Sequence, residues 1–435
     1  MTPPDETTSR APTRSFHGER SNAYLSWLAV AIALLVGGRG LLDGRFQEVL
    51  FAASVAAIAL APAIAVGSKR AALPWEIPIV AVLPLVGAVF APDQFVRQLV
   101  LYTGAAVLAL ALTLELHALT EIRFERWLAG SFVAMLAATF GAIWSTLTWI
   151  HDLALGTSLI ASNTEVMWLL VAATAAGSLA GTLFDRYYRQ FPGEELVSAP
   201  VDGIDEEVFA AKADMDEYPS LEERLPLSAD RQRQLVQLLR ATLVAMVAYG
   251  VVTVDPGIVS NTGAMLLVTF VPTLLRRRYD LPFDAGLVLW ITVVVFLHSL
   301  GSVYLYDQTF WWHNVTHPLS ATLVGAIGYV VIRTLDELRD DIHLPLELTP
   351  WFVVLFVVSF GVFWEIGEFA MDALAATTGL QMPLSQHGLA DTMTDLVFNT
   401  IGSILVAFWG LPYLTDLTDA VTDRLEGVPI LTSER

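Results

Sequence analysis

Apolar blocks of roughly 17 to 23 residues recur along the chain, and about 20 residues in a helix cross the hydrocarbon core of a bilayer. Short polar segments separate the blocks. The pattern predicts twelve membrane-spanning helices, at 24–38, 48–66, 76–91, 97–116, 128–150, 164–184, 235–254, 258–275, 285–304, 316–333, 351–372 and 394–413. We therefore expect an all-α, polytopic membrane protein.

The composition supports a place in the bilayer. Of the 435 residues, 55% are hydrophobic and 16% are charged, and the mean hydropathy is +0.58. A soluble domain needs more polar surface than this to cover its core. The bilayer is accordingly the first partner that the sequence indicates.

The distribution of Lys and Arg predicts the orientation. With the N-terminus inside, all but three of the 24 basic residues fall in cytoplasmic segments, and the exceptions are Arg39, Arg45 and Arg97. Short cytoplasmic loops carry this excess of positive charge in membrane proteins. We expect a multi-pass protein of the cell membrane with both termini and the central loop in the cytoplasm.

The chain divides into two sets of six spans. We expect a disordered tail at 1–22, an N-terminal half at 23–184, an acidic linker at 185–233, a C-terminal half at 234–413 and a tail at 414–435. The halves resemble each other, since "TFGAIWSTLTWIHD" from Thr139 aligns with "SFGVFWEIGEFAMD" from Ser359. With six spans each, the repeats would be parallel and related by an axis along the membrane normal.

Charge and cysteine content exclude several classes of function. The formal charge is −20, and only Lys69 and Lys212 are lysine, a composition typical of halophilic proteins. Nucleic acid is excluded as a partner, because a phosphate backbone needs a basic surface. The absence of cysteine excludes disulfides and thiolate metal sites. A metal would need histidine and carboxylate ligands.

Polar groups with such chemistry gather in the second half. They are His298, Asp307, His313, His317, Glu365, Glu368, Asp372, His387, Asp391, Asp395 and Asn399. Many are spaced by three or four residues, which places them on one helix face. The topology brings them all to the outer side of the membrane. In the aligned first half most counterparts are apolar or hydroxyl residues, and only Asp372 keeps an acidic one, Asp152, which favours a structural role at the helix end.

Ionisable groups in a membrane are costly unless they are paired, hydrated or functional. We interpret this set as a cluster that binds one or two divalent ions (Zn, Mn or Fe) or relays protons. The expected metal ligands are His313 or His317 with Glu365 and Asp391, while Glu368 or Asp395 would act as general acid or base. Further polar candidates are His298, Asp307, His387 and Asn399. The alternative is that these residues only cap helices and bond to neighbouring hydroxyls.

Three sequence elements resemble a family of uncharacterised six-span membrane proteins of the YjdF type. They are Tyr306–Asp307 followed by histidine, "WEIGEF" at Trp364–Phe369, and "DTMTDLVFNTIGS" at Asp391–Ser403. The resemblance covers the C-terminal half, and the N-terminal half would be a diverged copy. It implies a polar membrane site without a known reaction.

The leading hypothesis for the function is a metal-dependent membrane hydrolase acting on a lipid-linked or extracellular small-molecule substrate. A secondary transporter or proton-coupled carrier with a 6+6 layout is the alternative, because its two halves would also be joined by a long cytoplasmic loop. A non-catalytic sensor or assembly protein is a third. The sequence therefore leaves open whether the protein is an enzyme.

Overall fold

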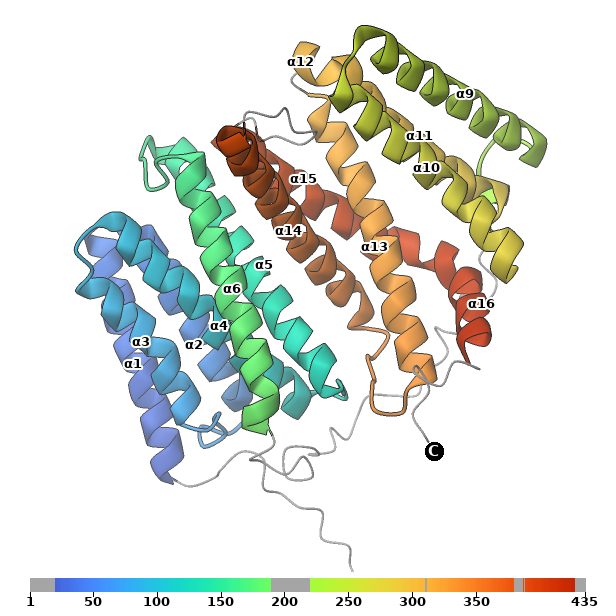
Figure 1. Ribbon diagram of the computed structural model, residues 1–435. Helices are drawn as coiled ribbons and strands as arrows, with labels where there is room; N and C mark the ends of the chain where they lie inside the picture. The colour runs from blue at the N-terminus through green and yellow to red at the C-terminus, as the bar shows by residue number, and fades with distance from the viewer. Residues whose placement is uncertain (1–19, 189–219, 310, 379–385, 387, 427–435) are drawn as a thin grey trace, which may run out of the picture. The chain divides into compact units, whose positions relative to one another are not determined.

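The computed structural model describes residues 20–188, 220–309, 311–378, 386 and 388–426. Within these ranges the chain is helical and has no β-strand (Figure 1). The helices are α1 Arg20–Leu42, α2 Phe46–Ala65, α3 Glu76–Val89, α4 Gln94–Leu119, α5 Arg126–Leu155, α6 Asn163–Tyr188, α8 Leu221–Arg224, α9 Ala229–Thr253, α10 Pro256–Tyr279, α11 Ala285–Leu300, η2 Gly301–Leu305, α12 Tyr306–Gln308, α13 His313–Leu338, α14 Thr349–Thr378, α15 Leu389–Leu405, η3 Val406–Gly410, η4 Leu411–Leu414 and α16 Thr415–Leu425.

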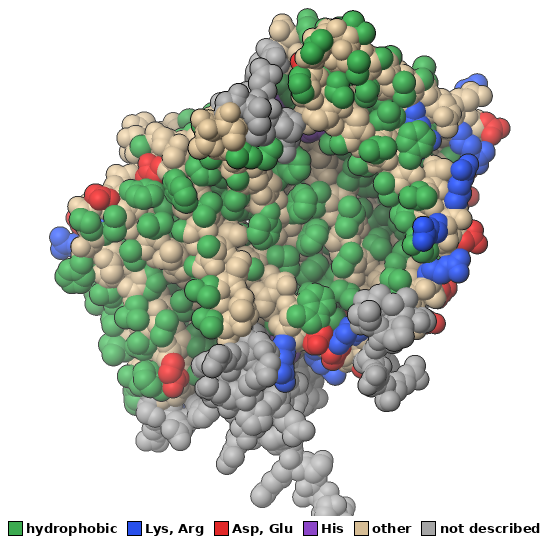
Figure 2. Space-filling view, in the orientation of Figure 1, with side chains coloured by type: hydrophobic (Ala, Val, Ile, Leu, Met, Phe, Trp, Pro, Cys, Tyr) green, Lys and Arg blue, Asp and Glu red, His purple; other side chains and the backbone are tan. Residues whose placement is uncertain are grey.

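Within the described residues, 11 helices are long and apolar enough to cross a membrane. The remaining expected span, the third along the chain at 76–91, corresponds to α3, which is apolar but has only 14 residues. Hydrophobic side chains cover most of the face seen in Figure 2, and charged side chains lie toward its margins. The prediction of an all-α polytopic membrane protein is therefore confirmed.

Several helices begin at an aspartate that accepts a backbone hydrogen bond. Asp93 caps α4 through Val96 N at 2.9 Å, Asp255 caps α10 through Ile258 N at 3.0 Å, and Asp284 caps α11 through Leu287 N at 2.6 Å. Such side chains satisfy amide groups that have no partner within the helix. The acidic residues at these span boundaries therefore have a structural role.

The contacts divide the chain into two compact units. One contains residues 1–137 and 172–204, and the other contains residues 138–171 and 205–435, so the boundary runs through α5 and α6. In the first unit α4 packs against α2 and α3. A Cβ atom at Gly104 of α4 would lie only 2.7 Å from Pro84 of α3, which shows how closely these two helices approach.

In the second unit α9, α10 and α11 pack on one another, and α13, α14 and α15 form another group. The stretch expected to be a C-terminal tail includes α16, which packs against α13 and buries Thr418 and Thr422. Residues 1–19, 189–219 and 427–435, which cover most of the expected N-terminal tail, linker and far C-terminus, lie outside the described residues. The duplication and the domain boundaries stay predictions.

Candidate metal centre

In the second unit α13 and α15 approach each other closely. A Cβ atom on Gly402 of α15 would lie 2.7 Å from the Cβ of Ala321 and would overlap the carbonyl oxygen of Pro318, both on α13. Small residues allow helix backbones to approach in this way in a membrane. The glycine therefore sets the separation of the two helices that carry the candidate ligands.

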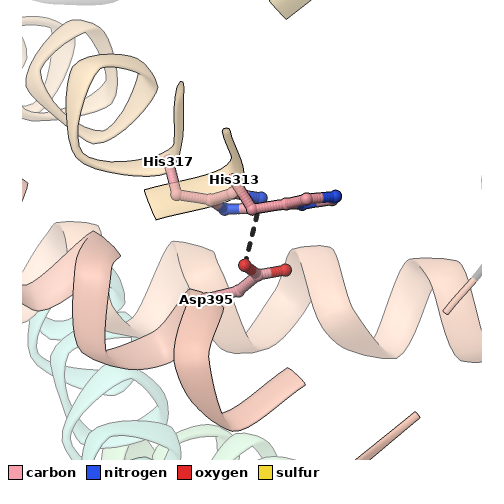
Figure 3. A group of neighbouring side chains, drawn as sticks. All are labelled: His313, His317 and Asp395. Atoms are coloured by element: carbon pink, nitrogen blue, oxygen red, sulfur yellow. Dashed lines mark ion pairs between the residues drawn. The ribbon is translucent and has the colours of Figure 1, made fainter. Parts of the chain in front are cut away.

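His313 and His317 lie one turn apart on α13 and face α15. Their rings are nearly parallel, at 16° with centroids 5.7 Å apart. His317 Nε2 lies 3.2 Å from Asp395 Oδ1, and His313 Nδ1 lies 4.0 Å from Asp391 Oδ1. Figure 3 shows both imidazoles beside the Asp395 carboxylate. The four-residue spacing on each helix therefore produces two stacked His–Asp pairs.

Three of these side chains are placed so that they could bind one metal ion. His313, His317 and Asp395 each offer a donor atom, and these atoms lie within 4.8 Å of one another. Ligands bound to one zinc ion at about 2.0–2.2 Å lie roughly 3–4 Å apart, so small side-chain rotations would complete the geometry. Two histidines and one carboxylate also form the facial ligand set of non-haem iron sites.

The charge of this region also favours a cation. Five carboxyl groups come from α14 and α15, yet the sequence contains no Lys or Arg in 285–332 or in 340–423. Asp395 is close enough to Glu365, Glu368 and Asp391 for their charges to interact. Since carboxylates away from water need compensation, either protons or a metal ion must balance them.

A second layer of residues orients the histidines. Asn399 of α15 forms a side-chain hydrogen bond with His317. The ring of Tyr306 stacks on His313 with centroids 4.0 Å apart, and its hydroxyl donates to Thr316 Oγ1 at 3.1 Å. The same hydroxyl lies 2.9 Å from Nδ1 of His298. These contacts place Asn399 and His298, both predicted as polar candidates, around the histidine pair.

The pKa of Tyr306 is also affected by the charges of the centre. Burial raises the pKa of its hydroxyl, the hydrogen bond with Thr316 lowers it, and the charges of Asp395, Glu368 and Asp391 raise it further. Gly301 makes room for the ring, because a Cβ atom there would lie 2.5 Å from the ring atom Cζ. The tyrosine is therefore a neutral hydrogen-bonding group that the charges of these acidic residues reach.

Glu365 and Glu368 have separate partners. Glu365 is 1% exposed, and its Oε2 accepts a hydrogen bond from Gln386 Nε2 at 2.9 Å. Gln386 Oε1 in turn accepts from Asn163 at 2.8 Å. Glu368 accepts from the indole of Trp364 at 2.9 Å. The three-membered metal group contains neither glutamate, although sequence spacing favoured Glu365 as a ligand.

The other predicted residues have different positions. Asp372 accepts a hydrogen bond from the backbone of Gln386 at 3.0 Å, and its counterpart Asp152 accepts from Leu159 and Ile160, also at 3.0 Å. Both aspartates thus hold the loop after their helix. Asp307 is in α12, but its side chain is outside what the structure describes, and His387 lies outside the described residues altogether.

Sequence reasoning missed two members of the centre. Tyr306 was not among the predicted site residues, although its place in the Tyr–Asp motif was a signal for a site. Gln386 carried no signal, because a glutamine in a loop has no periodic pattern and its contacts join segments more than 200 residues apart in sequence.

Comparison with known proteins shows what this region is similar to. Residues 235–416 match the model described as "Predicted membrane protein (DUF2238)", and residues 12–72 match a "Domain of unknown function (DUF8268)". An uncharacterised protein of Thermotoga maritima is 26% identical over 185 residues, which is 42% of this chain and 91% of the relative. No solved structure matches the chain. The resemblance of the C-terminal half to the YjdF type is confirmed, because its residues 235–416 match this family of membrane proteins.

Proposed function

We propose that the protein is a metal-dependent membrane hydrolase whose metal ion is held by His313, His317 and Asp395. The observation that carries the proposal is the convergence of these three donor atoms within 4.8 Å, on two helices that a glycine brings together. Three protein ligands leave a coordination position open, as catalytic zinc sites require. When bound, a divalent ion supplies Lewis acidity, which polarises a substrate oxygen or makes water a stronger nucleophile.

The surrounding residues have distinct roles in this proposal. Asn399 orients the His317 ring through its hydrogen bond, and Tyr306 fixes the plane of His313 by stacking. Asp391, whose carboxylate is 4.0 Å from His313 and 21% exposed, is the group best placed to exchange protons with substrate or water. Glu368 is the second candidate for general acid or base.

Metal analysis of the purified protein tests the first step. We expect about one equivalent of zinc, manganese or iron per chain in the wild type and less than about a tenth of that in His317→Ala and Asp395→Asn, because a missing ligand removes a large part of the affinity. His343→Ala is the matched control. That histidine contacts Asp336 at 3.1 Å and is in no metal group among the described residues.

The catalytic step needs a separate measurement. Protein reconstituted in vesicles is assayed with fluorogenic carboxylic esters and phosphodiesters before and after treatment with a chelator, and again after the metal is returned. We expect hydrolysis that the chelator abolishes and the metal restores. Full metal occupancy in the His317→Ala protein contradicts the site, while metal binding without hydrolysis of either substrate class contradicts the enzyme.

A further inference from the structure

The first compact unit buries two glutamates that differ in their partners. Glu48 on α2 is 1% exposed and Glu115 on α4 is 2% exposed. Both lie in helices that are long and apolar enough to span a membrane. They therefore form a matched pair with the same side chain, the same burial and the same unit.

Glu48 is paired with cations. Its Oε1 lies 3.5 Å from Arg45 Nη1 and 3.5 Å from Arg97 Nε, and Arg97 belongs to α4. Two guanidinium groups compensate the charge of a carboxylate that has left water. These ion pairs explain how Glu48 can be buried as an ionised residue, and they link α2 to α4.

Glu115 has no such compensation. Both of its carboxyl oxygens are buried, and neither has a hydrogen-bond partner among the described residues. The only ionisable side chain of α2 is Glu48, which is paired at the opposite end of α4, roughly 27 Å away along the helix axis. The only one on α3 is Glu76, which is exposed. On α4 itself, His117 lies two residues after Glu115. The charge interaction found for this histidine is with Arg123 in the next loop.

A carboxylate without a partner is strongly disfavoured away from water, whereas the carboxylic acid is not. No hydrogen bond from the described residues reaches the carboxyl group of Glu115, and ionisable groups inside membranes commonly have a functional role. We propose that Glu115 is a proton-binding site in the membrane part of the N-terminal region, which holds an exchangeable proton. This site is separate from the metal centre and does not depend on the proposed hydrolase.

Carbodiimide labelling of the full-length protein in membranes provides the first test. The acid proton of a neutral carboxyl group moves to a nitrogen of dicyclohexylcarbodiimide while the carboxyl oxygen bonds to its central carbon. The acyl group then migrates to nitrogen, and the stable N-acylurea retains the whole reagent. Peptide mapping should find the adduct on Glu115 and not on Glu48, and Glu115→Gln should remove it.

Infrared spectroscopy tests the bound proton without an added reagent. The difference between wild type and Glu115→Gln should contain a carboxylic C=O stretching band that shifts in D₂O, and the corresponding Glu48→Gln difference should contain carboxylate bands instead. Gln mimics the protonated acid, so Glu115→Gln should keep the wild-type unfolding temperature, while Glu48→Gln should lower it. A Glu115 difference spectrum with only carboxylate bands, or equal labelling of the two glutamates, overturns the proposal.

Discussion

The histidines and aspartates of the metal centre are arranged in pairs. Each histidine of α13 faces an aspartate of α15, and Asn399 continues the aspartate row by one more turn. Groups that bond to a metal ligand fix its tautomer and its ring orientation. Asn399 is thus the residue whose removal should disturb the site while every donor atom stays in place.

We expect Asn399→Ala to lower metal affinity about 10- to 100-fold, because the His317 ring loses its orienting hydrogen bond. Competition with a chromogenic chelator measures this affinity. The control is Thr394→Ala on the same helix, where the hydroxyl donates to the carbonyl of Ala390 at 2.6 Å and the affinity should not change. Unchanged affinity in Asn399→Ala would exclude a positioning role.

The packing of α13 against α15 determines which histidine meets which aspartate. The sequence predicted the helices and the four-residue spacing on each, because long apolar blocks and helical periodicity are strong signals. It left open the choice between His313 and His317, since pairing depends on the register between helices. That register follows from contacts at Gly402 and Ala321, which no spacing within one helix can reveal.

Gly402→Ala tests this close approach. The added Cβ would overlap the backbone of Pro318, so α13 and α15 must move apart, and overpacking of this kind costs typically about 1–3 kcal/mol. We expect a lower unfolding temperature in detergent together with reduced metal occupancy. Gly367→Ala on α14 is the control, because a Cβ there meets nothing within 4 Å among the described residues and the alanine should stabilise the helix by up to about 1 kcal/mol.

At the scale of the molecule, the metal centre and the family match coincide. Residues 235–416 contain every member of the three-residue metal group, and the matching region makes up nearly all of the Thermotoga maritima relative. Glu115 lies outside this region, in the first compact unit. The proposed proton site is therefore particular to the longer chain, whereas the metal centre falls in the part that it shares with the relative.

Orientation in the membrane decides which compartment reaches each site, and the Lys and Arg distribution predicts it. The loop that begins at Leu155 has no basic residue, while the segment containing Asp340 follows Arg333 and Arg339. Since the protein has no cysteine, single cysteines at these two exposed positions can be labelled without removing others. In intact cells an impermeant maleimide should modify Leu155→Cys and should reach Asp340→Cys only after the membrane is opened. Because α13 crosses the membrane once and ends just before Asp340, the metal centre at its start would then face outward, toward an extracellular or outer-leaflet substrate. Labelling of Asp340→Cys in intact cells would invert this assignment and place the substrate in the cytoplasm.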